Sequence, residues 1–375
     1  MNMLCSVKLV LCIMPCTETD WSISHSLKTK TLIFLVSDFN PSYISTVTIF
    51  LWSHIVMLKV GNILFVDCNL TTCLTVKVCF LRTTTVPLNL VKFNPLQDDL
   101  LQSGAPIDKN DFSYIHNGQK HHFDFAYITI HGTPGENGVL QGYLDMLRIP
   151  YSCCGVLAAA LSFNKYACNH YLSGFGIRTA KSILLRAGAP IPSAQSIVDE
   201  VGLPCFIKSN VGGSSFGCSK VKHIDEVVSA IEKAFAEGGE VICEAFLQGT
   251  EVTCGVYKTQ TKSIAFPITE VVTENEFFDY DAKYKGQVDE ITPARIPNAI
   301  RDRIQAETLR IYDILGCQGI IRVDWIITEG EQINLLEVNT TPGMTATSFI
   351  PQQVRAAGLD IKDVLTDIIE NTWQS

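Results

Sequence analysis

The sequence predicts an α/β protein from about residue 98 to the end of the chain. Short apolar runs such as FDFAYITIH at residues 123–131 are typical of strands, whereas apolar residues three and four apart are typical of helices, and the two patterns alternate. Loops rich in Gly and Pro, such as GTPGENG at 132–138, separate them. The chain has 375 residues, 47% of them apolar, which is enough for two or three domains with substantial cores.

The expected elements follow one another along the chain. A strand at 123–131 precedes helices at 139–147 and 163–172, and strands at 204–210 and 218–222 flank the segment GGSSFG at 212–217. A further strand is expected at 241–246, and a helix at 301–315 would turn Ile300, Ile304, Ile311 and Leu315 inward. Before the strand at 241–246, a helix that ends at Gly238 and Gly239 is expected. Its apolar stripe consists of Ile224, Val227, Val228, Ile231, Ala234 and Phe235.

Residues 1–97 differ in composition from the rest. They contain one glycine, no alanine and twelve threonines, and they carry a net charge of +3 against -12 for the remainder. The leading hypothesis is an out-of-register translation of a normal gene start, which sequencing of the locus would test. Residues 39–58 lack Lys, Arg, Asp and Glu, but Asn40, Pro41 and His54 make insertion costly, so we expect neither a membrane span nor a signal peptide.

Charge and cysteine content exclude other classes. The formal charge of -9 provides no field to hold nucleic acid. The 14 cysteines lack the paired spacing of zinc sites, and a chain of this length needs no disulfide framework. We therefore expect reduced thiols in a cytosolic protein.

A pair of alternating strands, GIIRVDWIITEGEQINLLEVNTTPG, is the most informative segment. If Gly330 and Glu331 form a two-residue type II′ turn, Asp324 lies opposite Glu337, and Arg322 lies opposite Asn339. Neighbouring carboxylates repel, so a cation should lie between them, and oxygen donors of this kind suit Mg²⁺. The alternative is a solvated hairpin face, although the other face is apolar, with Ile321, Val323, Trp325, Leu336 and Val338.

A nucleotide is suggested by GGSSFG, whose backbone amides and hydroxyls could close over phosphate oxygens. The segment is not a Walker loop, and a plain hairpin turn explains it almost as well. Lys208 lies on an apolar strand, where an anionic ligand would offset the cost of burying the ammonium. Glu244 and Glu251 bracket an apolar segment that could receive an adenine, with a carboxylate for the ribose.

Seven segments together carry a family resemblance: HGTPGENG, FIKSNVGGSSFG, EAFLQGTE, FFDYDAKY, IIRVDW, LLEVNTTPGMT and TSFIPQQ. From residue 105 to 375 the chain resembles the D-alanine:D-alanine ligases of the ATP-grasp superfamily. The resemblance implies an ATP-grasp fold of three α/β lobes with the first one incomplete or aberrant. The expected parts are an anomalous segment at 1–97, the remainder of the substrate lobe at 98–160, a central lobe with a phosphate lid at 161–250, and a metal-binding lobe at 251–375.

The resemblance also implies a role for each matching residue. For ATP these are Lys165, Lys208, Ser215 and Lys283 at the phosphates, Glu244, Ala245, Phe246 and Leu247 at the adenine, and Glu251 at the ribose. Two Mg²⁺ ions, with Mn²⁺ as an alternative, would be held by Asp324, Glu337 and Asn339. Arg322 and the Gly343 amide would stabilise an oxyanion, Tyr284 would close on Ser214, Ser348 and Phe349 would bind the second substrate, and His131 would lie near the first.

The implied reaction joins two D-alanine molecules through an acyl phosphate made from ATP, in a cytoplasmic homodimer that supplies peptidoglycan precursors without a nucleic-acid or membrane partner. Tyr284 accompanies D-alanine as the second substrate in the family, where Phe accompanies D-lactate. The family's opening GGxSxE loop, whose Glu binds the first D-alanine, has no counterpart in residues 1–97. A catalytically impaired ATP-binding remnant is therefore the alternative, and a ligase for a different amine is a third hypothesis that the segment 347–351 opposes.

Overall fold

The computed structural model describes residues 105–116, 118–212, 217–273 and 288–374, and the strands β1 (Ser6–Val7), β2 (Leu32–Val36), β3 (Ile63–Asn69) and β4 (Thr75–Leu81). The apolar stretch at 39–58 lies outside these residues. No helix in the described part of the chain combines the length and apolar character needed to cross a membrane.

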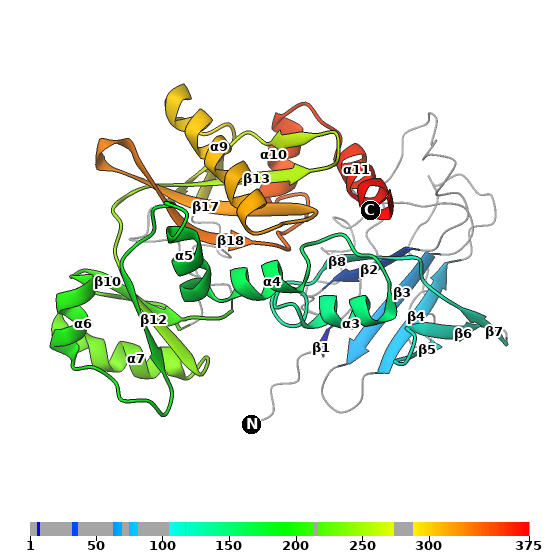
Figure 1. The fold of residues 1–375 in the computed structure, drawn as a ribbon, viewed down its shortest axis with the longest axis horizontal. Coiled ribbons are helices and arrows are strands. Elements are labelled where there is room, and N and C mark those ends of the chain that lie inside the picture. The colour runs from blue at the N-terminus through cyan, green and yellow to red at the C-terminus, as the bar shows by residue number, and fades with distance from the viewer. Residues whose placement is uncertain are drawn as a thin grey trace.

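The N-terminal part is built around β8 (Phe125–Thr129), which pairs in parallel with β2. The strands β5 (Ala105–Asp108), β6 (Ser113–His116) and β7 (Gln119–His121) extend a second sheet in the order β1-β3-β4-β5-β6-β7. Helix α3 (Val139–Leu147) has the predicted bounds, and its Leu144 packs with Ile128 and Ile130. Figure 1 shows this part on the right.

The helix predicted at 163–172 is α5 (Lys165–Ser173), and a helix that was not predicted, α4 (Val156–Phe163), precedes it. Asn164 separates them in an extended conformation (φ -94°, ψ 98°), and its side chain accepts a hydrogen bond from the Ala167 N–H. This is an N-cap, which starts a new helix because it satisfies one of the free first-turn amides. Lys165 is consequently the first residue of α5.

A four-stranded antiparallel sheet follows in the order β11-β10-β12-β9. Its strands are β9 (Ser182–Arg186), β10 (Cys205–Ser209), β11 (Ser219–Val221) and β12 (Glu240–Ala245). Helices α6 (Ala194–Val201) and α7 (Val227–Phe235) cover this sheet (Figure 1), and the 3-10 turn η4 (Ile224–Glu226) directly precedes α7.

The apolar stripe predicted for α7 is partly wrong. Val227, Ile231 and Ala234 are buried, but Val228 is 57% exposed and Ile224 is 39% exposed. Ile224 lies in the 3-10 turn before the helix, and Ala230 takes the buried place beside Ile231. The helix therefore presents a narrower face to the sheet than the spacing indicated.

The C-terminal sheet carries the predicted hairpin. Its order is β16-β15-β13-β17-β18, with β14 also paired to β13. The strands are β13 (Gly249–Lys258), β14 (Ser263–Ala265), β15 (Thr269–Thr273), β16 (Val288–Ile291), β17 (Ile320–Thr328) and β18 (Gln332–Asn339), with the 3-10 turn η5 (Glu329–Glu331) between the last two.

Helices cover both faces of this sheet. Helix α9 (Asn298–Ile314) buries Ile300, Ile304 and Ile311 against Val323 and Trp325, as predicted. Helices α10 (Phe349–Ala356) and α11 (Ile361–Gln374) contribute Ile350, Val354 and Ile368 to another core, which Phe125 and Tyr127 of β8 join. This second core connects the N-terminal strand β8 to the C-terminal part of the chain. The eight cysteines from Cys153 to Cys317 are free thiols, as expected.

The hairpin has the predicted register but not the predicted turn. Asp324 pairs with Glu337, and Arg322 pairs with Asn339. The loop, however, has three residues, because Thr328 pairs with Gln332. A β-bulge between Asp324 and Trp325 then inserts one residue and restores the register. As a result Leu335, rather than Leu336, packs beside Trp325 in the core.

Candidate active site

The paired strands β17 and β18 bring four predicted site residues onto one face. Arg322 donates from Nε and Nη2 to the two carboxylate oxygens of Asp324, at 2.9 and 2.8 Å. The Asn339 amide also donates to Asp324 Oδ2, at 3.1 Å. Burial would lower the pKa of Arg322, but the Asp324 and Glu337 carboxylates raise it. The guanidinium therefore stays charged.

Lys165 supplies a second cation at this face. Its ammonium lies 3.8 Å from Glu337 Oε2 and donates to the Gly212 carbonyl at 2.6 Å. Gly212 is the first residue of GGSSFG, so Lys165 joins the hairpin acid to the start of the expected phosphate lid. The cation that the sequence demanded beside Asp324 and Glu337 is thus provided in part by Arg322 and Lys165.

Lys208 is held by Glu244 on the neighbouring strand. Lys208 Nζ lies 2.7 Å from Glu244 Oε2, and the two side chains are only 17% and 4% exposed. Burial lowers the pKa of Lys208, but the Glu244 carboxylate outweighs this effect and raises it. The sequence indicated an anionic partner for Lys208, and within the protein that partner is Glu244.

The expected adenine segment lies at the end of β12. The Ala245 N–H donates to the Lys181 carbonyl at 2.8 Å, and the Phe246 N–H donates to the Pro204 carbonyl at 3.3 Å. Lys220 lies 4.0 Å from the centre of the Phe246 ring. Leu247 follows in the connection to β13, where Glu251 alternates onto the same sheet face as Asp324.

Three segments meet close to the point where β18 ends. A Cβ added to Gly343 would lie 2.8 Å from Ser348 Oγ and 3.8 Å from His131 Nε2, so the side chains of Ser348 and His131 lie next to Gly343. The Phe349 ring centre lies 5.2 Å from the Arg322 guanidinium carbon. The structure thus brings His131 and Ser348 together at Gly343, and Phe349 to Arg322.

Four predicted site residues, Ser214, Ser215, Lys283 and Tyr284, lie outside the described residues.

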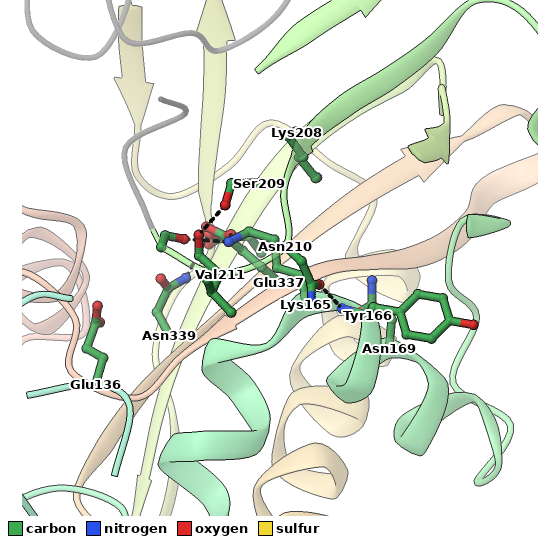
Figure 2. A network of polar contacts seen from close by, with 12 residues as sticks. Glu136, Lys165, Tyr166, Asn169, Lys208, Ser209, Asn210, Val211, Glu337 and Asn339 are labelled. Atoms are coloured by element: carbon green, nitrogen blue, oxygen red, sulfur yellow. Dashed lines mark hydrogen bonds and ion pairs between the residues drawn. The ribbon is translucent and has the colours of Figure 1, made fainter. Parts of the chain in front are cut away.

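A polar network that the sequence did not predict fixes Lys165 (Figure 2). Asn210 is fully buried, and its Oδ1 accepts from the Tyr166 N–H at 2.8 Å, while its amide donates to Glu240 at 2.8 Å and to Asn164 at 2.9 Å. Asn169, one helical turn after Lys165, approaches Glu244 Oε1 at 3.5 Å. The i, i+4 spacing could have indicated Asn169. No local pattern points to Asn210.

The hairpin donors fit a hard divalent cation. Asp324, Glu337 and Asn339 offer two carboxylates and an amide oxygen on adjacent strands, the oxygen chemistry that Mg²⁺ takes. A cluster of three His, Cys, Asp or Glu suited to a metal does not occur in the described part of the chain, so such an ion would need the amide or further oxygen ligands.

Comparisons with known proteins identify the family of the chain. The family model for the D-ala D-ala ligase C-terminus matches residues 172–370. A D-alanine--D-alanine ligase of Bacteroides fragilis is 69% identical over 271 residues, which cover 72% of this chain and 83% of that protein.

Two solved structures are similar as well. The VanG D-Ala:D-Ser ligase from Enterococcus faecalis has a TM-score of 0.67 and 30% identity, covering 78% of this chain and 86% of its own. A D-alanine--D-alanine ligase from Bacillus anthracis complexed with ATP has a TM-score of 0.58 and 31% identity, covering 67% and 80%. The chain has the ATP-grasp fold and belongs to the D-alanine:D-alanine ligase family.

Proposed function

We propose that the chain joins two D-alanine molecules, with ATP cleaved to ADP and phosphate, and that the dipeptide serves peptidoglycan synthesis in the cytoplasm. The protein from Bacteroides fragilis, 69% identical over most of its length, supports this activity, and it favours the ligase over the impaired remnant. We also propose the lobe boundaries 98–160, 161–250 and 251–375. The four-stranded sheet lies inside the second, and β13 begins two residues before the third.

One observation carries the proposal: one face of the hairpin contacts both the expected phosphate residues and the expected substrate residues. Lys165 lies 3.8 Å from Glu337, the cross-strand partner of Asp324, and Phe349 lies over Arg322, which binds Asp324. A phosphate held at the lysines would therefore face a carboxylate held near Gly343 and His131. This is the arrangement that phosphoryl transfer followed by acyl transfer requires.

The residues of this chain have separate tasks in the two steps. Lys165 and Lys208 hold the phosphates of ATP. Mg²⁺, as two ions with Mn²⁺ as a substitute, would be held by Asp324, Glu337 and Asn339 and would neutralise charge on the phosphates when bound. Arg322 and the Gly343 N–H donate to the oxygen that becomes negative when the second amine attacks, and Ser348 and Phe349 orient that substrate.

A coupled assay of ADP release tests this function. The unaltered chain should release ADP only when D-alanine is present, and Arg322→Met should lower the rate by about two to three orders of magnitude, because it removes an oxyanion donor. Lys222→Met is the control, because Lys222 is an exposed residue directly after β11. Nucleotide binding without D-alanine-dependent turnover would establish the impaired remnant instead.

The second substrate is proposed to be D-alanine because of Tyr284. A Tyr284→Phe variant should shift the preference from D-alanine towards D-lactate, measured by competition between the two acceptors. An unchanged preference would remove Tyr284 from this role.

We further propose a homodimer formed through α3 and α4. These helices expose three large apolar side chains, Val139, Met146 and Leu157, which are 60%, 78% and 77% exposed. Apolar side chains gathered on a surface often mark a protein interface. Light scattering should give a dimer mass, and Met146→Asp with Leu157→Asp should give a monomer. A monomeric parent chain would refute the proposal.

A further inference from the structure

Strand β13 has a break in its pairing on one edge. It pairs with β17 along its length, but its other edge pairs with β15 only up to Thr253 and with β14 only from Val256 onwards. At this break the Phe266 N–H donates to the Gly255 carbonyl at 2.9 Å. The Gly255 N–H is left facing the helix that covers the sheet. A buried backbone amide without a partner is costly, so the break requires another group.

The side chain of Gln353 occupies the break. It is fully buried on α10, its Oε1 accepts from the Gly255 N–H at 2.9 Å, and its Nε2 donates to the Thr253 carbonyl at 2.9 Å and to Thr269 Oγ1 at 3.1 Å. A Cβ on Gly255 would lie 2.4 Å from Ile350 Cδ1 and 2.8 Å from Gln353 Oε1. The glycine therefore permits the helix to approach the strand, and the glutamine fixes its position.

This contact lies beside Arg322, on the same face of the sheet. Gly255 pairs with Arg322 across the β13 and β17 ladder. Four residues before Gln353, Phe349 begins α10 and lies over the Arg322 guanidinium at 5.2 Å, and Ser348 precedes it. A helix that moved along or away from β13 would carry Ser348 and Phe349 away from Arg322.

We propose that Gln353 is a positioning residue for the acceptor D-alanine, which it serves by fixing the start of α10 relative to Arg322. The inference rests on the proposed function and adds a residue that touches neither substrate nor nucleotide. Its specific consequence is that the acceptor site, and not the ATP site, depends on the amide of Gln353.

The first test is Gln353→Met, which keeps the length of the side chain and removes its hydrogen bonds. The Michaelis constant of the acceptor D-alanine should rise about tenfold, while that of ATP stays within about twofold. The matched control is Gln305→Met, since Gln305 on α9 donates to the Phe266 carbonyl at 2.9 Å on the opposite side of the same sheet. It should lower the unfolding temperature without changing either constant.

The second test is Gln353→Glu, which has a signature that lost stability alone would not give. A protonated Glu can still accept from Gly255 and donate to Thr253, whereas an ionised Glu faces the Thr253 carbonyl with negative charge. Burial raises the pKa of such a carboxyl, so the acceptor constant should be near the parent value at about pH 6 and rise towards pH 8. This variant also carries the test if Gln353→Met does not fold.

The proposal would be overturned if the Michaelis constant of the acceptor D-alanine were the same in the parent and both variants at every pH. It would also be overturned if the Michaelis constant of ATP rose by the same factor as that of D-alanine. Calorimetric titration of D-alanine into the chain with ADP gives a readout without turnover. If the parent does not release ADP with D-alanine, the proposed function is wrong. The role of Gln353 is still tested by titration, because Gln353→Met should bind D-alanine more weakly than Gln305→Met does.

Discussion

At the scale of single residues, Lys208 and Glu244 show how a proposed site residue also stabilises the fold. An ammonium and a carboxylate that are almost completely buried are stable only as a pair, because each would lose its hydration without a partner. The sequence indicated that Lys208 needs an anionic partner, because it lies on an apolar strand, but it could not identify Glu244 as that partner. The two residues are 36 positions apart and meet only because β10 pairs with β12.

Lys208→Met should therefore weaken both stability and ATP binding. Leaving Glu244 buried without its cation should cost about 3 kcal/mol of unfolding free energy, measured by urea denaturation. Adding Glu244→Gln should recover most of the stability but not the affinity for ATP. Recovery of both would show that Lys208 serves the fold alone.

Gly343→Ala tests the proposed substrate-binding role of the residues around Gly343. The added Cβ would lie 2.8 Å from Ser348 Oγ, closer than real contacts, so Ser348 must move. We expect a loss of about tenfold or more in D-alanine-dependent turnover with unchanged nucleotide affinity. Gly142→Ala is the control, because its Cβ would meet only Val156 at 3.7 Å and alanine favours the helix. Equal turnover in the two variants would contradict the assignment.

At the scale of elements, the hairpin was predicted in part for the wrong reason. The alternation of apolar and polar residues identifies both strands, and the pairing of Asp324 with Glu337 follows from a two-residue turn. The structure has a three-residue turn and a bulge, and the two departures cancel at Asp324. Turn length and bulges depend on packing across the sheet, here on Leu335 beside Trp325, and a strand pattern alone does not contain that information.

The start of α5 is fixed by an element-scale network that local patterns did not indicate. Asn210 directly follows β10 and accepts a hydrogen bond from the Tyr166 N–H, so one side chain joins the end of the strand to the helix that carries Lys165. Asn210→Ala would leave the Tyr166 N–H and Glu240 without this partner.

We expect Asn210→Ala to lower the unfolding free energy by about 1 to 3 kcal/mol and to raise the Michaelis constant of ATP several-fold, because Lys165 loses its support. The D-alanine constants should not change. Asn298→Ala, at the exposed start of α9, is the comparison and should leave both constants unaltered. An ATP constant equal to that of the parent would mean that Asn210 stabilises the fold without positioning Lys165.

At the scale of the whole molecule, the site is a meeting of distant segments. His131 lies more than two hundred positions before Gly343 and Ser348, and no spacing rule brings it to them. The family resemblance supplied that convergence, and the fold explains it, because β8 packs with α10 and α11 in one core. The alternation of strand and helix patterns predicted the fold class, but the order of the strands in each sheet required the structure.

Acid stability is a property of the whole chain that one ion pair makes measurable. Glu270 on β15 accepts from both Nε and Nη2 of Arg295, each at 2.9 Å, and from its backbone N–H at 3.1 Å. The hydrogen bonds from Arg295 lower the pKa of Glu270 below its ordinary value of 4.5. A carboxyl whose pKa is lowered on folding stabilises the protein above its unfolded pKa, and this contribution is lost as the pH falls through the folded pKa.

Glu270→Gln should therefore be less stable than the parent by about 1 kcal/mol at pH 7, and the difference should shrink as the pH falls below 4.5. Glutamine keeps the bond from the Arg295 backbone and loses only the charge, so the pH dependence isolates the ion pair. Glu307→Gln is the matched control, because its Arg310 partner lies on an exposed helical surface, where such pairs contribute little. Denaturation midpoints between pH 3.5 and 7 measure both variants, and a Glu270→Gln difference that does not change with pH would show that the charge of Glu270 does not stabilise the fold.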